Sequence, residues 1–377
     1  MKHILMRGFL SAILMLLVLG TVSCNRNSDS QEDENVRYAQ SRHYMYSISE
    51  EGVFNVMDGL IHFVAEETHE DIIFCADPMC EHEPASSDNP DPVCSAALPE
   101  LSNHIAYYDG YIYYWVRVDF FNTKIYRIDI SSGVREFVAE YPYNFSSLGY
   151  AFYEDFLYCN AKIMKEPEND SVLLSYGLLL EVDLKNGGHR VIISADESEE
   201  SNYAATKFDV CGSTMFALVS DKEEKYLAKI NLDTLEETVL IEPENIRERF
   251  YCGIYDSDSY YYGTLHEIGI CNTATGADKV LVSVGEDAMI FTIIASNRGI
   301  FYSVYEQDVE TFYFYDVNMG ETWDISKQVE KFNINGYDGY MNKFSLSILE
   351  ENDEDGDGKV GTIGYSVVDV AKVLGEE

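Results

Sequence analysis

Four residues in one short, loop-like stretch have side chains that bind metals or form cross-links. The segment FCADPMCEHEPASSDNPDPVCSAAL (residues 74–98) contains Cys75, Cys80, His82 and Cys94. Three thiolates and one imidazole make a complete tetrahedral ligand set for structural zinc. Cys80 and His82 are two residues apart, so on an extended chain their side chains project to the same side. The sequence therefore predicts a zinc site at these four residues.

Other chemistry is also compatible with this segment. A disulfide, Cys80–Cys94 or Cys75–Cys80, suits an exported protein but leaves one cysteine unpaired and gives His82 no role. The thiols can also remain unbound. A catalytic Cys80–His82 pair is disfavoured, because residues two apart rarely reach hydrogen-bond geometry and the sequence shows no third group to orient them. A long, proline-rich loop in a compact domain normally has a function or a cross-link.

Four further cysteines lie in apolar stretches that are expected to form strands. Scattered cysteines of this kind do not look like a disulfide framework, and we expect small core side chains instead. They are Cys159, Cys211, Cys252 and Cys271.

A second candidate metal site is an acidic stretch, ENDEDGDGKV, near the C-terminus. Asp353, Asp355 and Asp357 alternate and are followed by Gly358, an arrangement by which calcium loops wrap a hard cation. The backbone carbonyl of Lys359 would add a ligand. A glycine stands where an EF-hand has its bidentate glutamate, and flanking helices are not expected. The sequence predicts a weak calcium loop here, and the alternative is a solvated acidic hairpin tip.

The N-terminus has the pattern of a secretory signal. Residues 1–23 have a basic start and an apolar run over residues 8–20, which is too short to span a bilayer. Small residues then precede Cys24, as in a bacterial lipobox, and residues 24–36 read as a flexible polar tether. We expect lipid attachment at Cys24 and a membrane-anchored domain on the extracytoplasmic face. Ordinary signal cleavage beside a chance cysteine is the alternative.

Charge and missing motifs exclude several function classes. The 377-residue chain has a formal net charge of −40 and a pI near 4.3. A polyanion of this strength repels nucleic-acid phosphates, so no nucleic-acid partner is expected. The sequence also lacks a phosphate loop, a dinucleotide-binding glycine motif, a nucleophile elbow and a His-Glu-x-x-His zinc motif.

A pattern of strands and turns recurs about every 40–50 residues, a period typical of repeat folds. Each unit has a short strand, a turn, an aromatic strand, a hairpin, a strand ending in an aliphatic-Asp pair, a second turn and a last strand. Examples are residues 104–140, 206–242, 249–284 and 290–326, and residues 147–194 fit with a longer hairpin. Short strands of alternating aromatic residues favour half-buried β-structure.

Four antiparallel strands in each unit predict an all-β fold, a single β-propeller, over residues 37–377. We expect about seven blades, and six or eight also fit the spacing. The first unit, about residues 42–77, precedes the Cys/His-rich insert at 75–98. The last unit, about 332–374, lacks a fourth strand, which a strand near 36–40 would supply. Two separate β-sandwiches are the alternative, because strand spacing alone does not distinguish them.

These features resemble a family of lipoproteins from Gram-positive anaerobes, whose propellers are similar to those of low-density-lipoprotein-receptor-related proteins. The YDGYIYY…IYRID units and the segment CADPMCEHEPASSDNPDPVC carry the resemblance. Cys75, Pro78, Cys80, His82 and Cys94 fill the family's Cys-x-x-Pro-x-Cys-x-His…Cys run, with a longer gap before Cys94. The resemblance implies fold and location, since the family has no settled activity.

The expected function is a surface-anchored, non-catalytic propeller that binds an unknown protein or glycan. Its second partner is the lipid membrane, reached through acylated Cys24. The rival expectation is an extracytoplasmic glycoside hydrolase or lyase with carboxylates at the propeller axis. A structural or sensing subunit of a membrane complex is a third interpretation.

Overall fold

A computed structural model describes the chain from residue 46 to residue 374. The description omits residues 69, 91, 100–103, 120, 166–173, 195–204, 222–223, 246–248, 297, 330–332, 339–342, 352–359 and 371–373. The chain divides into two units, Met1–Asn35 and Val36–Glu377, and every described residue belongs to the second. The predicted signal peptide, Cys24, the tether and the strand near 36–40 lie outside the described residues.

The second unit is built from antiparallel β-sheets whose strands follow one another in chain order. Six sheets have four strands and are called here the first to sixth blades. They are β1 (Tyr46–Ile48), β2 (Gly52–Met57), β3 (Leu60–Ala65) and β4 (Asp71–Ile73); β5 (Ala106–Tyr108), β6 (Tyr111–Arg117), β7 (Thr123–Asp129) and β8 (Arg135–Tyr141); β9 (Asn144–Tyr153), β10 (Phe156–Lys165), β11 (Leu174–Asp183) and β12 (His189–Ser194); β13 (Ala205–Cys211), β14 (Thr214–Asp221), β15 (Glu224–Asn231) and β16 (Glu237–Ile241); β17 (Phe250–Asp256), β18 (Ser259–Gly263), β19 (Glu267–Asn272) and β20 (Asp278–Ser283); β21 (Ala288–Ala295), β22 (Gly299–Glu306), β23 (Val309–Asp316) and β24 (Glu321–Asp324). A seventh sheet has the three strands β25 (Asn333–Asp338), β26 (Lys343–Glu351) and β27 (Val360–Asp369).

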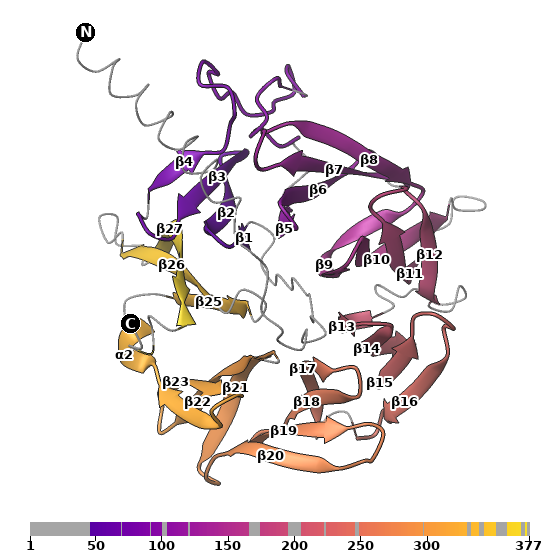
Figure 1. The fold of residues 1–377 in the computed structure, drawn as a ribbon, viewed down its shortest axis with the longest axis vertical. Coiled ribbons are helices and arrows are strands. Elements are labelled where there is room, and N and C mark those ends of the chain that lie inside the picture. Colours follow the sequence, from indigo (N-terminus) through magenta and orange to yellow (C-terminus); the bar gives the residue numbers. More distant parts are fainter. Residues whose placement is uncertain are drawn as a thin grey trace, which may run out of the picture. The chain divides into compact units, whose positions relative to one another are not determined.

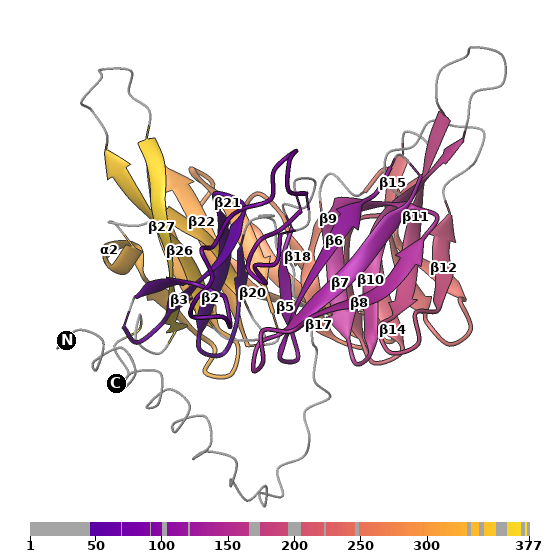
Figure 2. The same ribbon diagram turned by 90° about the horizontal axis from the view of Figure 1, so that it is seen from above.

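The sheets lie side by side around a ring, with the first strand of each blade innermost (Figure 1). Strand β1 contacts β5, β9 contacts β13, and β17 contacts β13 and β21. Strand β27 contacts β2 and β3, so the three-stranded sheet lies against the first blade. This is a single β-propeller, which confirms the predicted fold class and excludes two separate sandwiches. The number of four-stranded blades is six rather than the seven expected, a count that the spacing had left open. In a view from above, the β10–β11 and β26–β27 hairpins extend past the other strands (Figure 2).

Tight turns join β2 to β3 in the first blade and β5 to β6 in the second because the sequence supplies residues that tolerate positive φ. Asp58 and Gly59 have φ values of 52° and 76°, and Asp109 and Gly110 have 48° and 80°. Two successive positive-φ residues are the signature of a type I′ hairpin turn, and Asp-Gly is a favoured pair there. The YDG motif therefore acts as the sequence predicted.

An aspartate or asparagine that ends the third strand of several blades forms a recurring turn. Its side-chain oxygen accepts hydrogen bonds from the backbone N–H groups two and three residues later, at 2.7 to 3.0 Å. The N–H four residues later donates to its carbonyl, and that residue has positive φ. The pairs of first and fifth residues are Asp129 and Gly133, Asp183 and Gly187, Asn231 and Leu235, and Asp316 and Gly320.

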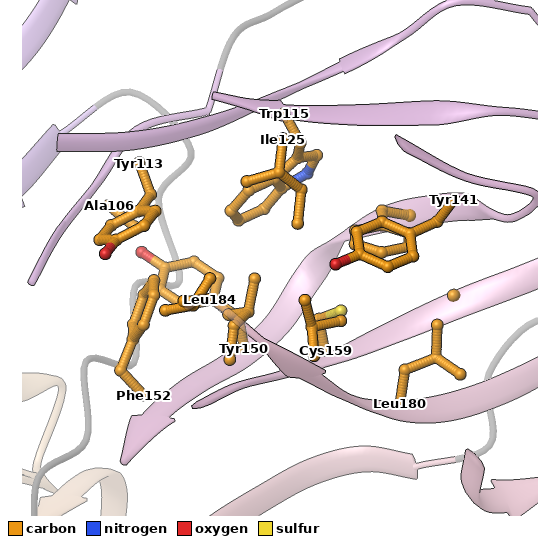
Figure 3. Packing of buried hydrophobic residues seen from close by; sticks show 14 of the residues in the cluster. Ala106, Tyr113, Trp115, Ile125, Tyr141, Tyr150, Phe152, Cys159, Leu180 and Leu184 are labelled. Carbon is orange, nitrogen blue, oxygen red and sulfur yellow. The ribbon is translucent and has the colours of Figure 1, made fainter. Parts of the chain in front are cut away.

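The core lies between blades, where aromatic side chains of one sheet meet those of the next. Figure 3 shows this packing between the second and third blades. The rings of Tyr108 and Phe152 stack with centroids 4.7 Å apart, and Trp115 meets Tyr150 edge to face at 5.5 Å. All four side chains are buried. Aromatic pairs of this kind stabilise the seam beyond the area they bury.

Helical structure is sparse in the described part of the chain. The short helix α2 (Ser326–Val329) follows β24, and Ser326 joins it to the sixth blade because its hydroxyl accepts a hydrogen bond from the Phe312 N–H at 3.0 Å. Among the described residues, no helix combines the length and the apolar character needed to cross a membrane.

Candidate metal centre

The segment that follows β4 folds back onto the first blade instead of passing directly to the second. The Ile61 N–H donates to the Ala96 carbonyl at 2.8 Å, and the Leu98 N–H donates to the Gly59 carbonyl at 3.0 Å. Leu60 and Ala97 form an isolated β-bridge. Residues 94–98 are thus held against the β2–β3 turn, which fixes the backbone of Cys94.

The structure brings the four predicted metal ligands together. The donor atoms of Cys75, Cys80, His82 and Cys94 all lie within 4.8 Å of one another. The Cys94 Sγ is 3.8 Å from His82 Nδ1. Standard Zn–S and Zn–N lengths place two tetrahedral ligand atoms ~3.6 Å apart for sulfur and nitrogen, so only small shifts separate this cluster from a zinc geometry. Cys94 is buried and the other three residues are half-buried.

A compact turn built on Asp77 presents the middle ligands. The Met79 N–H donates to the Asp77 carboxylate at 2.8 Å, and the Cys80 N–H donates to the Asp77 carbonyl at 3.1 Å. The His82 N–H then donates to the Cys80 sulfur at 3.4 Å. His82 has a φ of 56°, which is uncommon for a residue with a side chain. This turn gives the predicted Cys80 and His82 pair its common direction.

The thiols of the cluster differ in acidity. Burial alone would raise the pKa of Cys75. Hydrogen bonds with the Asp77 backbone, the Ser95 side chain and the neighbouring thiols outweigh the effect of burial, so the pKa of Cys75 is lowered. Burial raises the pKa of Cys94 to about 11, and the two neighbouring cysteines add to the rise. Thiols this close share protons, so one thiolate is favoured at the expense of another. Binding a cation would remove this competition.

Arg135, which sequence reasoning missed, holds the last ligand's backbone. Its Nη2 donates to the carbonyls of Cys94, Ser95 and Ala97 at 3.0, 3.3 and 2.5 Å. The guanidinium lies 5.9 Å from the centroid of the Tyr114 ring. Arg135 begins β8 in the second blade, and no local motif connects it with a loop some 40 positions earlier in the chain. Only the packing of the two blades reveals this contact.

The remaining site predictions have mixed outcomes. Cys159, Cys211 and Cys252 are buried and Cys271 is half-buried, as expected for core side chains. All seven cysteines among the described residues are free, so neither Cys80–Cys94 nor Cys75–Cys80 is bridged. The predicted calcium ligands, and Cys24, lie outside the described residues. The calcium ligands are Asp353, Asp355, Asp357 and Lys359.

Comparison with known proteins shows the fold but no family. No protein-family model and no curated protein sequence matches the chain. Among solved structures, an oligogalacturonate lyase in complex with manganese has a TM-score of 0.52 and 11% identity, covering 90% of this chain and 92% of that one. A prolyl endopeptidase (TM-score 0.47, 9% identity, 89% and 51% coverage) and the acylaminoacyl peptidase of Pyrococcus horikoshii (0.47, 13%, 90% and 54%) are also similar. This chain spans about half the length of both peptidases.

These similarities correct the expected function. The oligogalacturonate lyase is an enzyme that has this fold, so the absence of familiar catalytic motifs does not support a non-catalytic role, and that prediction is contradicted. The similarity to lipoproteins of Gram-positive anaerobes stays a prediction. At such low identity, what the comparison shows is that this chain has the β-propeller fold of the oligogalacturonate lyase.

Proposed function

We propose that this protein binds one Zn²⁺ ion through Cys75, Cys80, His82 and Cys94. The observation that carries the proposal is the convergence of four donor atoms within 4.8 Å. These residues come from a segment with little apolar content, and only part of it pairs with the first blade. A metal that bonds to all four side chains supplies the cohesion that such a loop cannot obtain from a core of its own.

The donor set selects the kind of metal. Thiolate sulfur is a soft ligand that suits zinc, whereas calcium, magnesium and manganese favour oxygen ligands. The manganese of the lyase complex therefore has no counterpart in the chemistry of this cluster. Four protein ligands complete a tetrahedron, so no coordination position remains for water or a substrate. The proposed ion is accordingly structural, and it fastens residues 75–94.

The test is metal analysis of the purified chain, together with mass spectrometry of its thiols. One equivalent of zinc is expected, with three cysteines protected from alkylation until a chelator is added. Cys80→Ser should lose the metal and lower the melting temperature. Cys271→Ser, which changes a half-buried cysteine outside the cluster, is the matched control and should retain the metal. A metal-free chain with a Cys80–Cys94 or Cys75–Cys80 disulfide would overturn the proposal.

A second candidate function is cleavage of a saccharide. One specific observation favours it: the similarity to oligogalacturonate lyase extends over about nine-tenths of both chains, so no further domain is needed to account for that fold. The innermost strands of the six blades carry two carboxylates, Asp209 on β13 and Asp256 on β17. Asp209 is buried and accepts a hydrogen bond from Tyr251. Because one of the two is buried, they do not supply the pair of accessible acids that a hydrolase needs.

A panel of neutral and uronate-containing oligosaccharides separates the possible reactions. β-Elimination forms a carbon–carbon double bond conjugated with the uronate carboxyl group, which ultraviolet absorbance detects. Hydrolysis releases reducing ends without that absorbance. We expect elimination products, and because the chain carries a net charge of −40, faster cleavage when salt screens its repulsion from a uronate polymer. No cleavage of any substrate in the panel would count against this candidate.

We also propose that the protein is attached to the extracytoplasmic face of the cell membrane through lipid on Cys24. The lipobox-like end of the signal and the polar tether support this location. The wild-type chain expressed in a bacterium should fractionate with the membrane and carry an acyl mass on its N-terminal peptide. Cys24→Ala should abolish the acyl mass, and equal acylation of both chains would contradict the proposal.

A further inference from the structure

We propose that Arg135 is a positioning residue of the metal centre, which couples metal binding beside the first blade to the outer strand of the second. This inference rests on the proposed zinc site and names a residue outside its ligands. Three backbone carbonyls converge on one guanidinium nitrogen of Arg135, those of Cys94, Ser95 and Ala97. Arg135 therefore sets the path of the chain that carries the buried ligand Cys94.

Residues 94–98 form hydrogen bonds with both the first and the second blade. On the first blade, Gly59 and Ile61 pair with Leu98 and Ala96. On the second blade, Arg135 binds the carbonyls that these backbone bonds leave open. The Cys94 carbonyl also accepts the Ala97 N–H at 3.1 Å, which closes a tight turn directly after the ligand. The hydrogen bonds from Arg135 to this turn restrict the position of the Cys94 sulfur in the metal-free protein. Less conformational entropy is therefore lost when the metal binds.

A second contact between the same turn of the second blade and the metal loop supports the coupling. Gly133, two residues before Arg135, has a φ of 66° and lies against Ala76, which follows the ligand Cys75. A side chain at Gly133 would collide with Ala76. The β7–β8 turn thus approaches both ends of the ligand segment, near its first and its last cysteine.

Charge gives Arg135 a second role. Zn²⁺ bound to three thiolates and a neutral imidazole has a net charge of −1, and the protein already carries −40. A guanidinium close to the backbone of the buried ligand offsets that charge where water is scarce. Lysine would keep the charge but would not reproduce the planar arrangement of donors. Outer partners of metal ligands commonly contribute 10- to 100-fold in metal affinity.

The experiment compares zinc affinity in the full chain, measured by competition with a chromophoric chelator, for wild type and three variants. Arg135→Met retains an unbranched stem near Tyr114 but removes every donor. We expect about 10- to 100-fold weaker zinc binding and faster zinc release. Arg135→Lys should lose less than Arg135→Met. Cobalt substitution should show the thiolate-to-metal absorption of wild type with altered intensity in Arg135→Met, because the Cys94 ligand is less well fixed.

The matched control is Arg127→Met on β7, the strand paired with β8. Arg127 binds Glu136 at 2.8 Å and lies 4.5 Å from the centroid of the Tyr111 ring, on blade residues rather than the loop. Its loss should change stability with unchanged zinc affinity. Wild-type affinity in Arg135→Met, or an equal loss in Arg127→Met, overturns the inference while leaving the zinc site intact. A wild-type chain that binds no zinc overturns the proposed function itself, and this inference with it.

Discussion

The Tyr251 hydroxyl donates a hydrogen bond to the carboxylate of Asp209 at 2.5 Å, across the seam between the fourth and fifth blades. Asp209 is 2% exposed, and both residues lie on the innermost strands, β13 and β17. Lys207 lies on the same strand as Asp209, with its ammonium 5.3 Å from the centroid of the Tyr251 ring, and donates to the Cys252 carbonyl. A polar cluster therefore joins these two blades at their innermost strands.

Removing the Tyr251 hydroxyl should weaken this seam. In Tyr251→Phe the buried Asp209 carboxylate loses a donor while the aromatic ring stays in place. The free energy of unfolding is expected to fall by about 1–3 kcal/mol, the usual cost of removing a hydrogen-bond donor from a buried polar group. Chemical denaturation of both chains measures the difference. A Phe variant as stable as wild type would show that the bond contributes nothing to the seam.

Replacing Asp209 by Asn should remove a pH-dependent contribution to stability. Burial raises the pKa of Asp209, while Lys207 and the Tyr251 hydroxyl act in the opposite direction without cancelling it. A raised folded-state pKa gives stability that is present at low pH and lost as the pH rises through that pKa. From pH 4 upward, wild type should therefore lose stability relative to Asp209→Asn. Parallel melting temperatures across this range would contradict the assignment.

His104 should give the stability of the protein the opposite pH dependence. Burial lowers the pKa of His104 to about 4, and its ring stacks on Trp115 with centroids 6.0 Å apart. As the pH falls below about 6.5, His104 binds a proton in the unfolded chain but not in the folded chain. The free energy of unfolding is therefore highest above that pH and decreases as the pH falls toward 4. In His104→Phe, which retains an aromatic ring, that loss should disappear. Thermal melts at several pH values measure it, and a pH-independent difference between the chains would refute it.

The fold was predictable because its signals are local. Hairpin turns such as Asp109–Gly110, aromatic alternation, and an aspartate at the end of the third strand repeat along the chain, and each depends on residues a few positions apart. The number of complete blades was not predictable from the sequence, because the spacing gives the number of repeats but not the number of strands that pair within each repeat. The last sheet has three described strands, and the segment predicted to complete it falls outside the described residues.

The same distinction applies to the candidate site. The four ligands were found because they lie within one short segment whose composition cannot form a core. Arg135 and Gly133 were missed because they belong to the next blade and reach the loop only through packing. Tyr251 and Asp209 look like ordinary members of two aromatic strands. Their contact depends on which blades are neighbours and on the relative shift of the two strands, which the sequence of a single chain does not reveal.

The recurring turn at the end of the third strand gives a prediction with an internal control. Leu235 occupies the position where four other blades have glycine, and its φ of 60° disfavours a side chain. Because Leu235 is 40% exposed, little packing is lost when the side chain is removed. Leu235→Gly should raise the free energy of unfolding by about 1 kcal/mol. The reciprocal change, Gly276→Ala in the fifth blade, adds a Cβ in open space at a φ of 68° and should lower it by about the same amount. Denaturant titration measures both, and a stabilising Gly276→Ala or a destabilising Leu235→Gly would show that packing, rather than backbone conformation, determines the residue at this position.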